Sequence, residues 1–469
     1  MIPGIGKFFE ERWAGVRRWK VRKQVCLALG LCLTAFLLAW GFDQFILKTP
    51  VLTPFGEKPA LTPLYAFWIP RIGWTAWVFP LFCVFFVVFA ARFADAKRTG
   101  RGKFLLFLAV SSLALPLGLF LIRRPVNQLG FQFNIYPGEE FIFDAIRIQN
   151  LGDFLRGYVE LMPRLSLHGK HFPPGHATFL YIVQQFFGKS LLVAGMAVLA
   201  AFSSGTLMCY GAFKTLLNES AARWGALLLL ASPSLLDFAC TSMDAVFFAF
   251  AALALWLSFS AFCGTRSIVL SAAAGAALAL AAFFSFSAIP LGFFLLLFCV
   301  FNYRRKGIAI LVQLASGVAG GIGFVGLVFL GTGFSLLSCF SAAIPLNQEF
   351  MASILGRAPL ELYPFISFGN ASAFLIGAGL AVVGSALLRI VHGQFKGDRL
   401  LPAFLLTLAA MVFGGVYVME TERIWLFAIP WLAMAAAGSG RILHQAGPAL
   451  LTAGLAQALI MELILFTLW

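Results

Sequence analysis

Runs of about twenty apolar residues recur along almost the whole chain, and they constrain the fold more than any other feature. A helix of that length crosses the roughly 30 Å hydrocarbon core of a bilayer. The composition agrees, because 61% of the 469 residues are hydrophobic and the mean hydropathy is +0.92. Soluble domains are only about half apolar. The sequence therefore predicts an all-α, polytopic membrane protein.

The spacing of the apolar runs predicts about 13 transmembrane helices. We expect them at residues 25–46, 74–93, 104–122, 189–212, 223–240, 244–262, 267–285, 287–302, 308–331, 367–389, 399–418, 424–438 and 447–468. Two polar stretches, 123–188 and 332–365, separate some of these runs. Each is long enough to form a substantial loop, and we expect the first to carry juxtamembrane helices.

The net charge of +15 reflects membrane topology and not nucleic-acid binding. Lys and Arg cluster in short segments between apolar runs, such as 94–103 and 304–306, as the positive-inside rule expects. With those segments in the cytoplasm and the basic N-terminus retained there as a signal anchor, residues 123–188 lie outside. We expect a multi-pass protein of the bacterial inner membrane with its active site facing outward.

The eight cysteines all lie in or beside apolar runs and show no C-x-x-C spacing. They are typical of small membrane-embedded side chains and indicate neither a disulfide framework nor a zinc site. No internal repeat of 20–50 residues is evident, which weakens a secondary-transporter interpretation.

The first outer stretch is the main departure from the apolar pattern. Five carboxylates lie between Gln128 and Gly188, and they are followed by a segment rich in histidine. The polar side chains that we single out here are Glu139, Glu140, Asp144, Asp153, Lys170, His171 and His176. Ionisable groups at membrane depth are costly, so they usually pair or line a cavity.

Two further outer turns carry charges. Asp237 and Asp244 lie between the 223–240 and 244–262 runs, and Glu420-Thr421-Glu422-Arg423 precedes the 424–438 run. Each has a simple structural explanation, since the aspartates could cap helices and the 420–423 turn could hold a local ion pair. Their convergence on one side of the membrane favours a functional site.

Residues 177–187 follow a Pro-Pro-Gly break and are too short to span a bilayer. We interpret them as an interfacial helix with apolar side chains in the lipid boundary and with Gln184 and Gln185 facing water. Such a helix would hold the preceding polar segment against the membrane, where a lipid-borne substrate would reach it.

The order of these motifs resembles the GT-C membrane glycosyltransferases. It is most similar to the branch with protein O-mannosyltransferases and lipid A aminoarabinose transferases. The motifs that carry the resemblance are Glu139-Glu140, Phe141 and Phe143, His168-Gly169-Lys170, Phe172-Pro173-Pro174-Gly175, Phe186-Phe187-Gly188, Ser232-Pro233, Asp244 and Glu422-Arg423-Ile424-Trp425. The chain departs from the family in its Glu-Glu pair, in the displaced His171 and in two extra spans before the family's first helix.

The resemblance implies transfer of a sugar from a polyprenyl-phosphate donor to a lipid, glycan or protein acceptor. A carboxylate would accept the proton of the acceptor, and cations would stabilise the leaving phosphate. Glu140 is the expected base, with Glu139 or Asp144 as alternatives. The expected substrate-binding residues are Lys170, His171, His176, Asp244, Glu422 and Arg423, of which Arg423 and Lys170 would contact the phosphate. We expect no metal and no cofactor.

Three regions follow from this division. Residues 1–103 form a basic N-terminus and two extra spans, 104–332 form the GT-C-like core with the outer segment 123–188, and 333–469 form the second outer loop and the last spans. The alternative function is a transporter or flippase of a lipid-linked saccharide, and a scaffold in envelope assembly is a third. The acids gather on one side of the membrane, which favours the enzyme. Nucleic acid is not an expected partner, whereas membrane lipids are.

Overall fold

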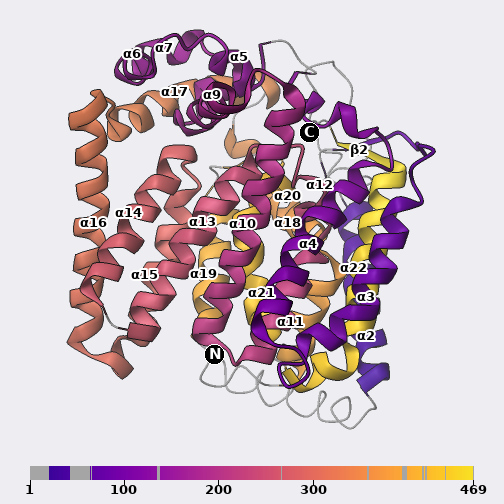
Figure 1. Cartoon of the computed structure of the whole chain (residues 1–469). Helices are drawn as coiled ribbons and strands as arrows, with labels where there is room; N and C mark the ends of the chain where they lie inside the picture. The colour runs from indigo at the N-terminus through magenta and orange to yellow at the C-terminus, as the bar shows by residue number, and fades with distance from the viewer. Residues whose placement is uncertain are drawn as a thin grey trace.

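A computed structural model describes residues 21–42, 64, 66–134, 138–265, 267–355, 359–392, 399–414, 417, 420–438 and 440–467. The basic segment 1–20 and parts of three predicted spans (43–46, 415–416 with 418, and 468) lie outside the described residues. The described chain is almost entirely helical, as predicted (Figure 1). One short strand pair is the exception: β1 (Ala66–Trp68) pairs antiparallel with β2 (Leu465–Thr467).

Six described helices are long and apolar enough to cross a membrane, by length and composition. They are α4 (Arg101–Phe120), α10 (Leu191–Leu216), α13 (Asp244–Phe259, continued by the π-helical turn η5, Ser260–Thr265), α16 (Ile308–Thr332), α18 (Pro359–Val391) and α22 (Gly440–Ile464). Six others carry shorter apolar stretches: α2 (Val21–Phe42), α3 (Val78–Ala94), α14 (Ile268–Phe284), α15 (Ala288–Lys306), α19 (Leu400–Phe413) and α21 (Ile429–Ala437, preceded by the 3₁₀ turn η6, Leu426–Ala428). The chain is thus a multi-pass membrane protein, and twelve of its predicted spans correspond to these helices.

The remaining predicted span, 223–240, is wrong as a single helix. The chain forms α11 (Glu219–Leu230), breaks at Ala231 and Ser232, and continues as the one-turn helix α12 (Pro233–Asp237). Proline has no backbone N–H and its ring collides with the preceding helical turn, so Pro233 can begin a helix but cannot continue one. Both helices are buried at the centre of the bundle, where α11 packs against α21.

The backbones of α14 and α16 pack closely against each other at one edge of the bundle. At Gly275 of α14, a Cβ atom would overlap the backbone carbonyl of Gly317 on α16. At Gly320, a Cβ atom would overlap the backbone of Ala272. Small residues at such contacts let transmembrane helices approach closely, which lipid-embedded helices use in place of a hydrophobic driving force.

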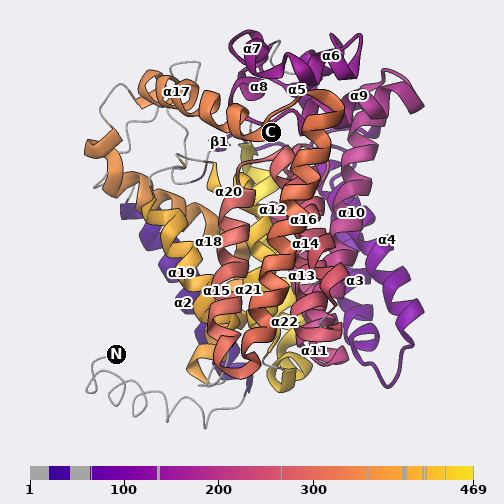
Figure 2. The ribbon, with the colours of Figure 1, turned by 90° about the vertical axis from the view of Figure 1, so that its left-hand side faces the viewer.

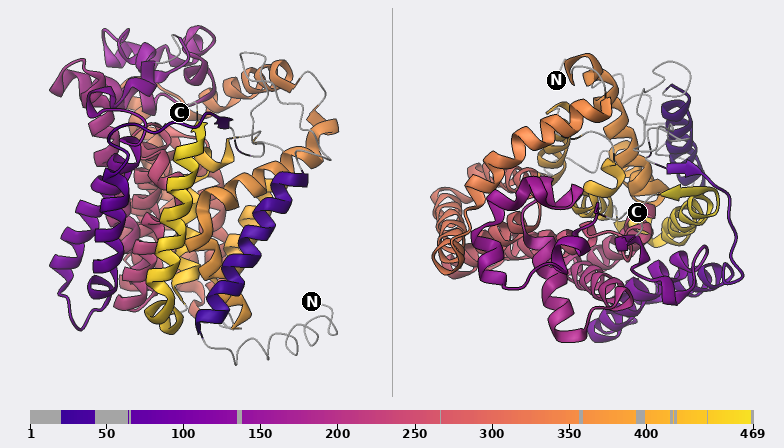
Figure 3. Two further views of the ribbon diagram at one scale, coloured as in Figure 1. Left: turned by 90° about the vertical axis from the view of Figure 1, so that its right-hand side faces the viewer. Right: turned by 90° about the horizontal axis from the view of Figure 1, so that it is seen from above.

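A cap of short helices covers one end of the bundle (Figures 1 and 2). Its first part is α5 (Phe141–Ala145), α6 (Leu151–Arg156), α7 (Tyr158–Leu161), η4 (Met162–Arg164), α8 (Leu167–His171) and α9 (Gly175–Phe187), preceded by the 3₁₀ turns η2 (Val126–Gln128) and η3 (Phe131–Asn134). Its second part is α17 (Leu336–Leu355). Seen from above, both parts lie across the helix ends (Figure 3).

The two parts of the cap share a small hydrophobic cluster. Tyr158 and Met162 pack there with Phe334, Cys339 and Ala343. The stretch 332–365, expected as a loop, is therefore helical over most of its described length, because α17 buries one face against the first outer segment. Juxtamembrane helices in that segment were predicted and are present.

Helix α9 corresponds to the predicted interfacial helix, with one correction. Ile182, Phe186 and Phe187 are exposed, as lipid-facing side chains would be. Gln185 is exposed, but Gln184 is buried, contrary to expectation. Gln184 lies four residues after buried Leu180 and next to buried Val183, so it belongs to the face of α9 that packs on the bundle.

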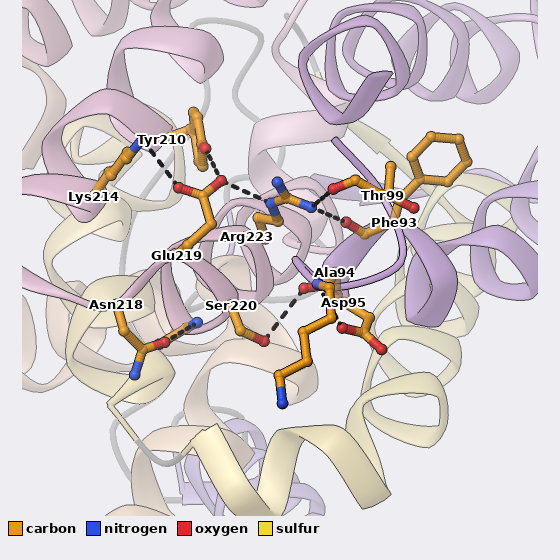
Figure 4. A network of polar contacts seen from close by, with 12 residues as sticks. Phe93, Ala94, Asp95, Thr99, Tyr210, Lys214, Asn218, Glu219, Ser220 and Arg223 are labelled. Atoms are coloured by element: carbon orange, nitrogen blue, oxygen red, sulfur yellow. Dashed lines mark hydrogen bonds and ion pairs between the residues drawn. The ribbon is translucent and has the colours of Figure 1, made fainter. Parts of the chain in front are cut away.

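At the opposite end of the bundle, a polar network fixes the turn between α3 and α4 (Figure 4). Arg223 donates to Glu219 Oε1 (2.8 Å) and to the backbone carbonyls of Phe93 (3.0 Å) and Thr99 (2.7 Å). Glu219 also accepts from Tyr210 and lies 3.1 Å from Lys214 Nζ. This network joins α10, α11 and the connecting turn into one unit.

Candidate functional site

The acid pair precedes α5 at the inner surface of the cap. Glu140 occupies the N-cap position of α5 with an extended backbone, and its side chain is buried. Backbone N–H groups of Leu167 and His168 donate to the carbonyls of Gly138 and Glu139, both at 3.0 Å. These two bonds align the start of α8 with the acid pair, which brings His168 beside Glu140.

Asp144, one of the three predicted base candidates, forms a clamp within the cap. It accepts hydrogen bonds from the backbone N–H (2.9 Å) and the hydroxyl (2.5 Å) of Ser166. Ser166 Oγ in turn accepts from the backbone N–H of Gly169. A Cβ atom at Gly169 would collide with Asp144 Oδ2, so only glycine fits there. Burial raises the pKa of the Asp144 carboxyl, while the hydrogen bonds from Ser166 oppose that shift.

Hydrogen bonds from Tyr158 stabilise the C-terminal end of the same turn. Its hydroxyl lies 3.0 Å from the carbonyl of Gly169 and 2.8 Å from that of Phe172, as donor to both. The side chain is fully buried, and burial raises the pKa of the phenol, so it remains a hydrogen-bond donor. The turn that carries the histidines is thus fixed at both ends.

His168 faces Glu140 directly. Its Nε2 atom lies 3.5 Å from Glu140 Oε1, and both side chains are largely buried. The ring of Phe141 lies beside His168 (5.6 Å between centroids) and His176 (4.6 Å). Burial and the nearby His168 and Arg423 lower the pKa of His176 to about 3, so His176 is neutral at physiological pH.

The acid pair and His168 form one wall of the site. The 420–423 turn and the start of α13 form a second wall. The short helix α20 (Thr421–Ile424) presents Arg423, whose Nη1 lies 3.2 Å from Asp244 Oδ2. Arg423 also pairs with Glu420, and Asp244 accepts from the hydroxyl of Ser242 at 2.9 Å. The expected helix-capping role for Asp244 is not seen, because Asp244 is the first residue of α13 and no side chain caps that helix.

Glu420 adopts a left-handed backbone conformation (φ 55°, ψ 20°). It is the one non-glycine residue with positive φ in the described part of the chain. Such a conformation costs of order 1–3 kcal/mol and persists where the surroundings enforce it. Here it turns the carboxylate of Glu420 toward Arg423.

The two walls are close enough for their charges to interact. Glu140 and Arg423 attract each other, and His168 attracts Asp244. Burial raises the pKa of the Glu139 carboxyl, and the negative charges of Glu140 and Glu420 add to that shift, while His168 opposes it. Glu139, Glu140, His168, His176, Asp244, Glu420 and Arg423 therefore form one site beneath the cap, which we call the cap site.

Other predicted site residues lie elsewhere. His171 packs against Phe350 of α17, with 4.9 Å between ring centroids. Burial, together with His168 and Lys170, lowers its pKa to about 4. Lys170 is half-buried in the last turn of α8.

Glu422 faces away from the cap site. It lines a separate cavity of about 20 Å³ with Ser234, Asp237 and Glu462. A cavity of this size holds one water molecule. Next to it, Arg123 lies 3.2 Å from Glu462 and donates to the carbonyl of Ile69 at 2.9 Å, which ties the strand pair to the bundle.

Sequence reasoning missed two members of the cap site, His168 and Glu420. Both lie within motifs that were singled out, but their neighbours His171 and Glu422 were preferred. Among the described residues, no group of three or more His, Cys, Asp or Glu side chains could hold a metal ion.

Comparison with known proteins concerns the middle of the chain. Residues 171–327, which are 157 of the 469, match the family model described as dolichyl-phosphate-mannose-protein mannosyltransferase. The resemblance to GT-C glycosyltransferases is confirmed. This segment contains His171, His176 and Asp244, whereas the acid pair and Arg423 lie outside it. The match thus supports the GT-C glycosyltransferase class without assigning a catalytic base.

Two solved GT-C-related structures are distantly similar. The crystal structure of ArnT from Cupriavidus metallidurans bound to undecaprenyl phosphate is 17% identical, with a TM-score of 0.42 over 74% of this chain and 60% of that chain. The Archaeoglobus fulgidus oligosaccharyltransferase complex with Zn and sulfate is 15% identical, with a TM-score of 0.37 over 63% of this chain and 45% of that chain. The chain therefore spans 60% or less of these proteins, and similarity at this level supports no residue correspondence. No curated protein matches the chain.

Proposed function

We propose that this GT-C glycosyltransferase transfers a sugar from a polyprenyl-phosphate donor to an acceptor on the extracytoplasmic side of the membrane. The observation that carries the proposal is the electrostatic attraction between buried Glu140, from the first outer segment, and buried Arg423, from the turn before the last spans. A base and a phosphate-binding cation at one buried site are the two groups that this transfer requires. The family description, which refers to a dolichyl-phosphate mannose donor, supports this donor class.

Glu140 is the proposed base. It is buried, and its carboxylate faces His168 and the Arg423 wall. Both oxygens of Asp144 are occupied by Ser166, which favours a structural role for that residue. Glu139 is half-buried and remains the second candidate.

In the proposed step, the acceptor hydroxyl loses its proton to Glu140 while its oxygen attacks the anomeric carbon. The bond between that carbon and the phosphate oxygen breaks, and the lipid phosphate leaves with the electron pair. Arg423, held by Asp244 and Glu420, would stabilise the negative charge on the leaving phosphate. Lys170, in the last turn of α8, is a second candidate contact, and the proposal gives His171 and Glu422 no direct role.

The test is sugar transfer by purified protein in lipid nanodiscs. Polyprenyl-phosphate mannose and polyprenyl-phosphate aminoarabinose serve as probe donors, and envelope lipid, glycan and protein fractions serve as acceptors. Glu140→Gln should reduce transfer at least a hundredfold, because general-base catalysis contributes about 10²–10⁴-fold. Glu160→Gln is the matched control, since Glu160 lies exposed in the same outer segment.

Full activity of Glu140→Gln would exclude Glu140 as the base. Movement of a lipid-linked sugar across sealed vesicles without a new glycosidic bond would support the flippase alternative.

A further inference from the structure

We infer that His168 is a positioning residue that holds the carboxylate of Glu140 directed into the cap site. This inference rests on the proposed role of Glu140 as base. Its basis is geometric: His168 Nε2 lies 3.5 Å from Glu140 Oε1, and their side chains retain only 12% and 7% of their accessible surface.

The position of His168 is fixed by the fold. Its backbone N–H donates to the carbonyl of Glu139, and the clamp of Asp144 on Ser166 holds the start of α8. The ring is confined by Phe141 and by Phe172, whose centroids lie 5.6 and 6.5 Å away. A side chain with so little freedom can hold its partner in one orientation.

The charges around His168 are mostly negative. Four carboxylates face it: Glu139, Glu140 and Asp144 from the α5 segment and Asp244 from α13. The other titratable groups that interact with it are His171 on α8 and His176 on α9, and both have low pKa values (about 4 and about 3) and are neutral near pH 7. Lys170 and Arg423 lie near those two histidines. His168 therefore interacts with acidic groups from two separate elements of the cap site.

The experiment combines His168→Gln, Glu140→Gln and the double variant, assayed with the probe donor that the wild-type protein turns over. His168→Gln should lower kcat roughly tenfold, as loss of a group that orients a functional ligand does, and leave the KM for the donor unchanged. In the Glu140→Gln background, the same change should cost less than about twofold, because the two residues act as one unit.

His444→Gln is the matched control. His444 contacts Ser220 at the opposite end of the bundle, so this variant should keep wild-type kcat. Thermal unfolding of each variant in detergent shows whether it is folded, and His168→Asn provides a second, smaller substitution if His168→Gln is not. A strongly impaired Glu140→Gln together with an additive further loss in the double variant would overturn the inference alone. An active Glu140→Gln would overturn the base assignment and this inference together.

Discussion

Arg423 Nη1 lies 3.2 Å from Asp244 Oδ2, and both side chains retain less than 10% of their accessible surface. The pair joins residues 179 positions apart in the chain and connects the 420–423 turn to α13. Removing one member of a buried ion pair leaves the other as an uncompensated charge, which costs about 3–5 kcal/mol. The pair therefore stabilises the contact between the 420–423 turn and α13, and it holds the arginine that is proposed to bind phosphate.

Arg423→Gln should abolish measurable sugar transfer, because it removes the proposed contact to the leaving phosphate. Asp244→Asn should retain partial activity, since Glu420 still pairs with Arg423. Steady-state transfer rates and thermal unfolding would measure both effects. Exposed Arg156, which pairs with Asp153 at the surface, gives the control Arg156→Gln. Normal transfer by folded Arg423→Gln would contradict the phosphate role.

Glu420 combines a left-handed backbone with a carboxylate that pairs with Arg423, and two substitutions separate these properties. Glu420→Gln keeps the unfavourable conformation and loses the charge. Glu420→Asn also loses the charge, but asparagine tolerates positive φ, so it should be more stable by about 1 kcal/mol. Both should lose activity to a similar extent. Chemical unfolding and transfer rates would be compared, and equal stability of the two variants would contradict backbone strain at this position.

The close contacts around Gly169 predict that this position does not tolerate a larger side chain. In Gly169→Ala, the added methyl group would meet Asp144 Oδ2, Leu165 Cβ (2.9 Å) and Ser166 Oγ (3.0 Å). We expect destabilisation of at least about 2 kcal/mol and loss of activity, because the turn that carries His168 must move. Gly102→Ala is the control, since a Cβ atom there meets open space. An active, stable Gly169→Ala protein would show that the clamp adapts.

The network of Figure 4 predicts an acid-dependent part of the stability. Burial alone would raise the pKa of Glu219, but hydrogen bonds from Tyr210, Arg223 and Lys214 outweigh it and lower the pKa to about 2. A carboxyl with a lowered pKa stabilises the fold above its ordinary value of 4.5, and that stability is lost as the pH falls toward 2. The difference in unfolding temperature between wild type and Glu219→Gln should be greatest near pH 7 and should shrink below pH 4.5. A constant difference across that range would contradict the ion-pair network.

Burial of neutral His176 predicts a second pH dependence of folding stability, in a different pH range from that of Glu219. Its folded pKa of about 3 lies below the ordinary 6.5, so the unfolded chain binds a proton that the folded chain does not. Stability should therefore fall as the pH drops from 6.5 toward 3. His176→Phe keeps an aromatic ring among Phe141, Phe172 and Phe284 and removes this dependence. Parallel slopes of unfolding temperature against pH in both proteins would show that His176 is not buried in its neutral form.

The helical, membrane-spanning character of the chain could be predicted from hydropathy, because the bilayer leaves few alternatives to helices. The break at Ser232-Pro233 carried a visible signal, since proline rarely continues a helix. Helix α17 did not. Its sequence contains Pro345, Asn347 and Glu349, and it becomes helical by packing Cys339 and Ala343 against the cap.

The structure groups some of the predicted site residues and separates others, and their roles stay a prediction. The acid pair, Asp244 and Arg423 belong to the cap site, and the sequence singled out all four. The sequence could not distinguish His168 from His171, because that choice depends on how one turn of α8 is rotated. Nor could it distinguish Glu420 from Glu422, because nothing in the local sequence indicates the left-handed backbone at Glu420.

The two-part cap has a consequence for biosynthesis. Tyr158 and Met162 can pack only after their partners Phe334, Cys339 and Ala343 have been synthesised, which happens about 180 residues later. At typical translation rates of about 5–20 residues per second, this delay is on the order of ten to forty seconds. Throughout that interval the first outer segment exposes its apolar cluster, so nascent chains stopped before α17 should be protease-sensitive in this segment. The cap would therefore be complete only after about three quarters of the chain has been made.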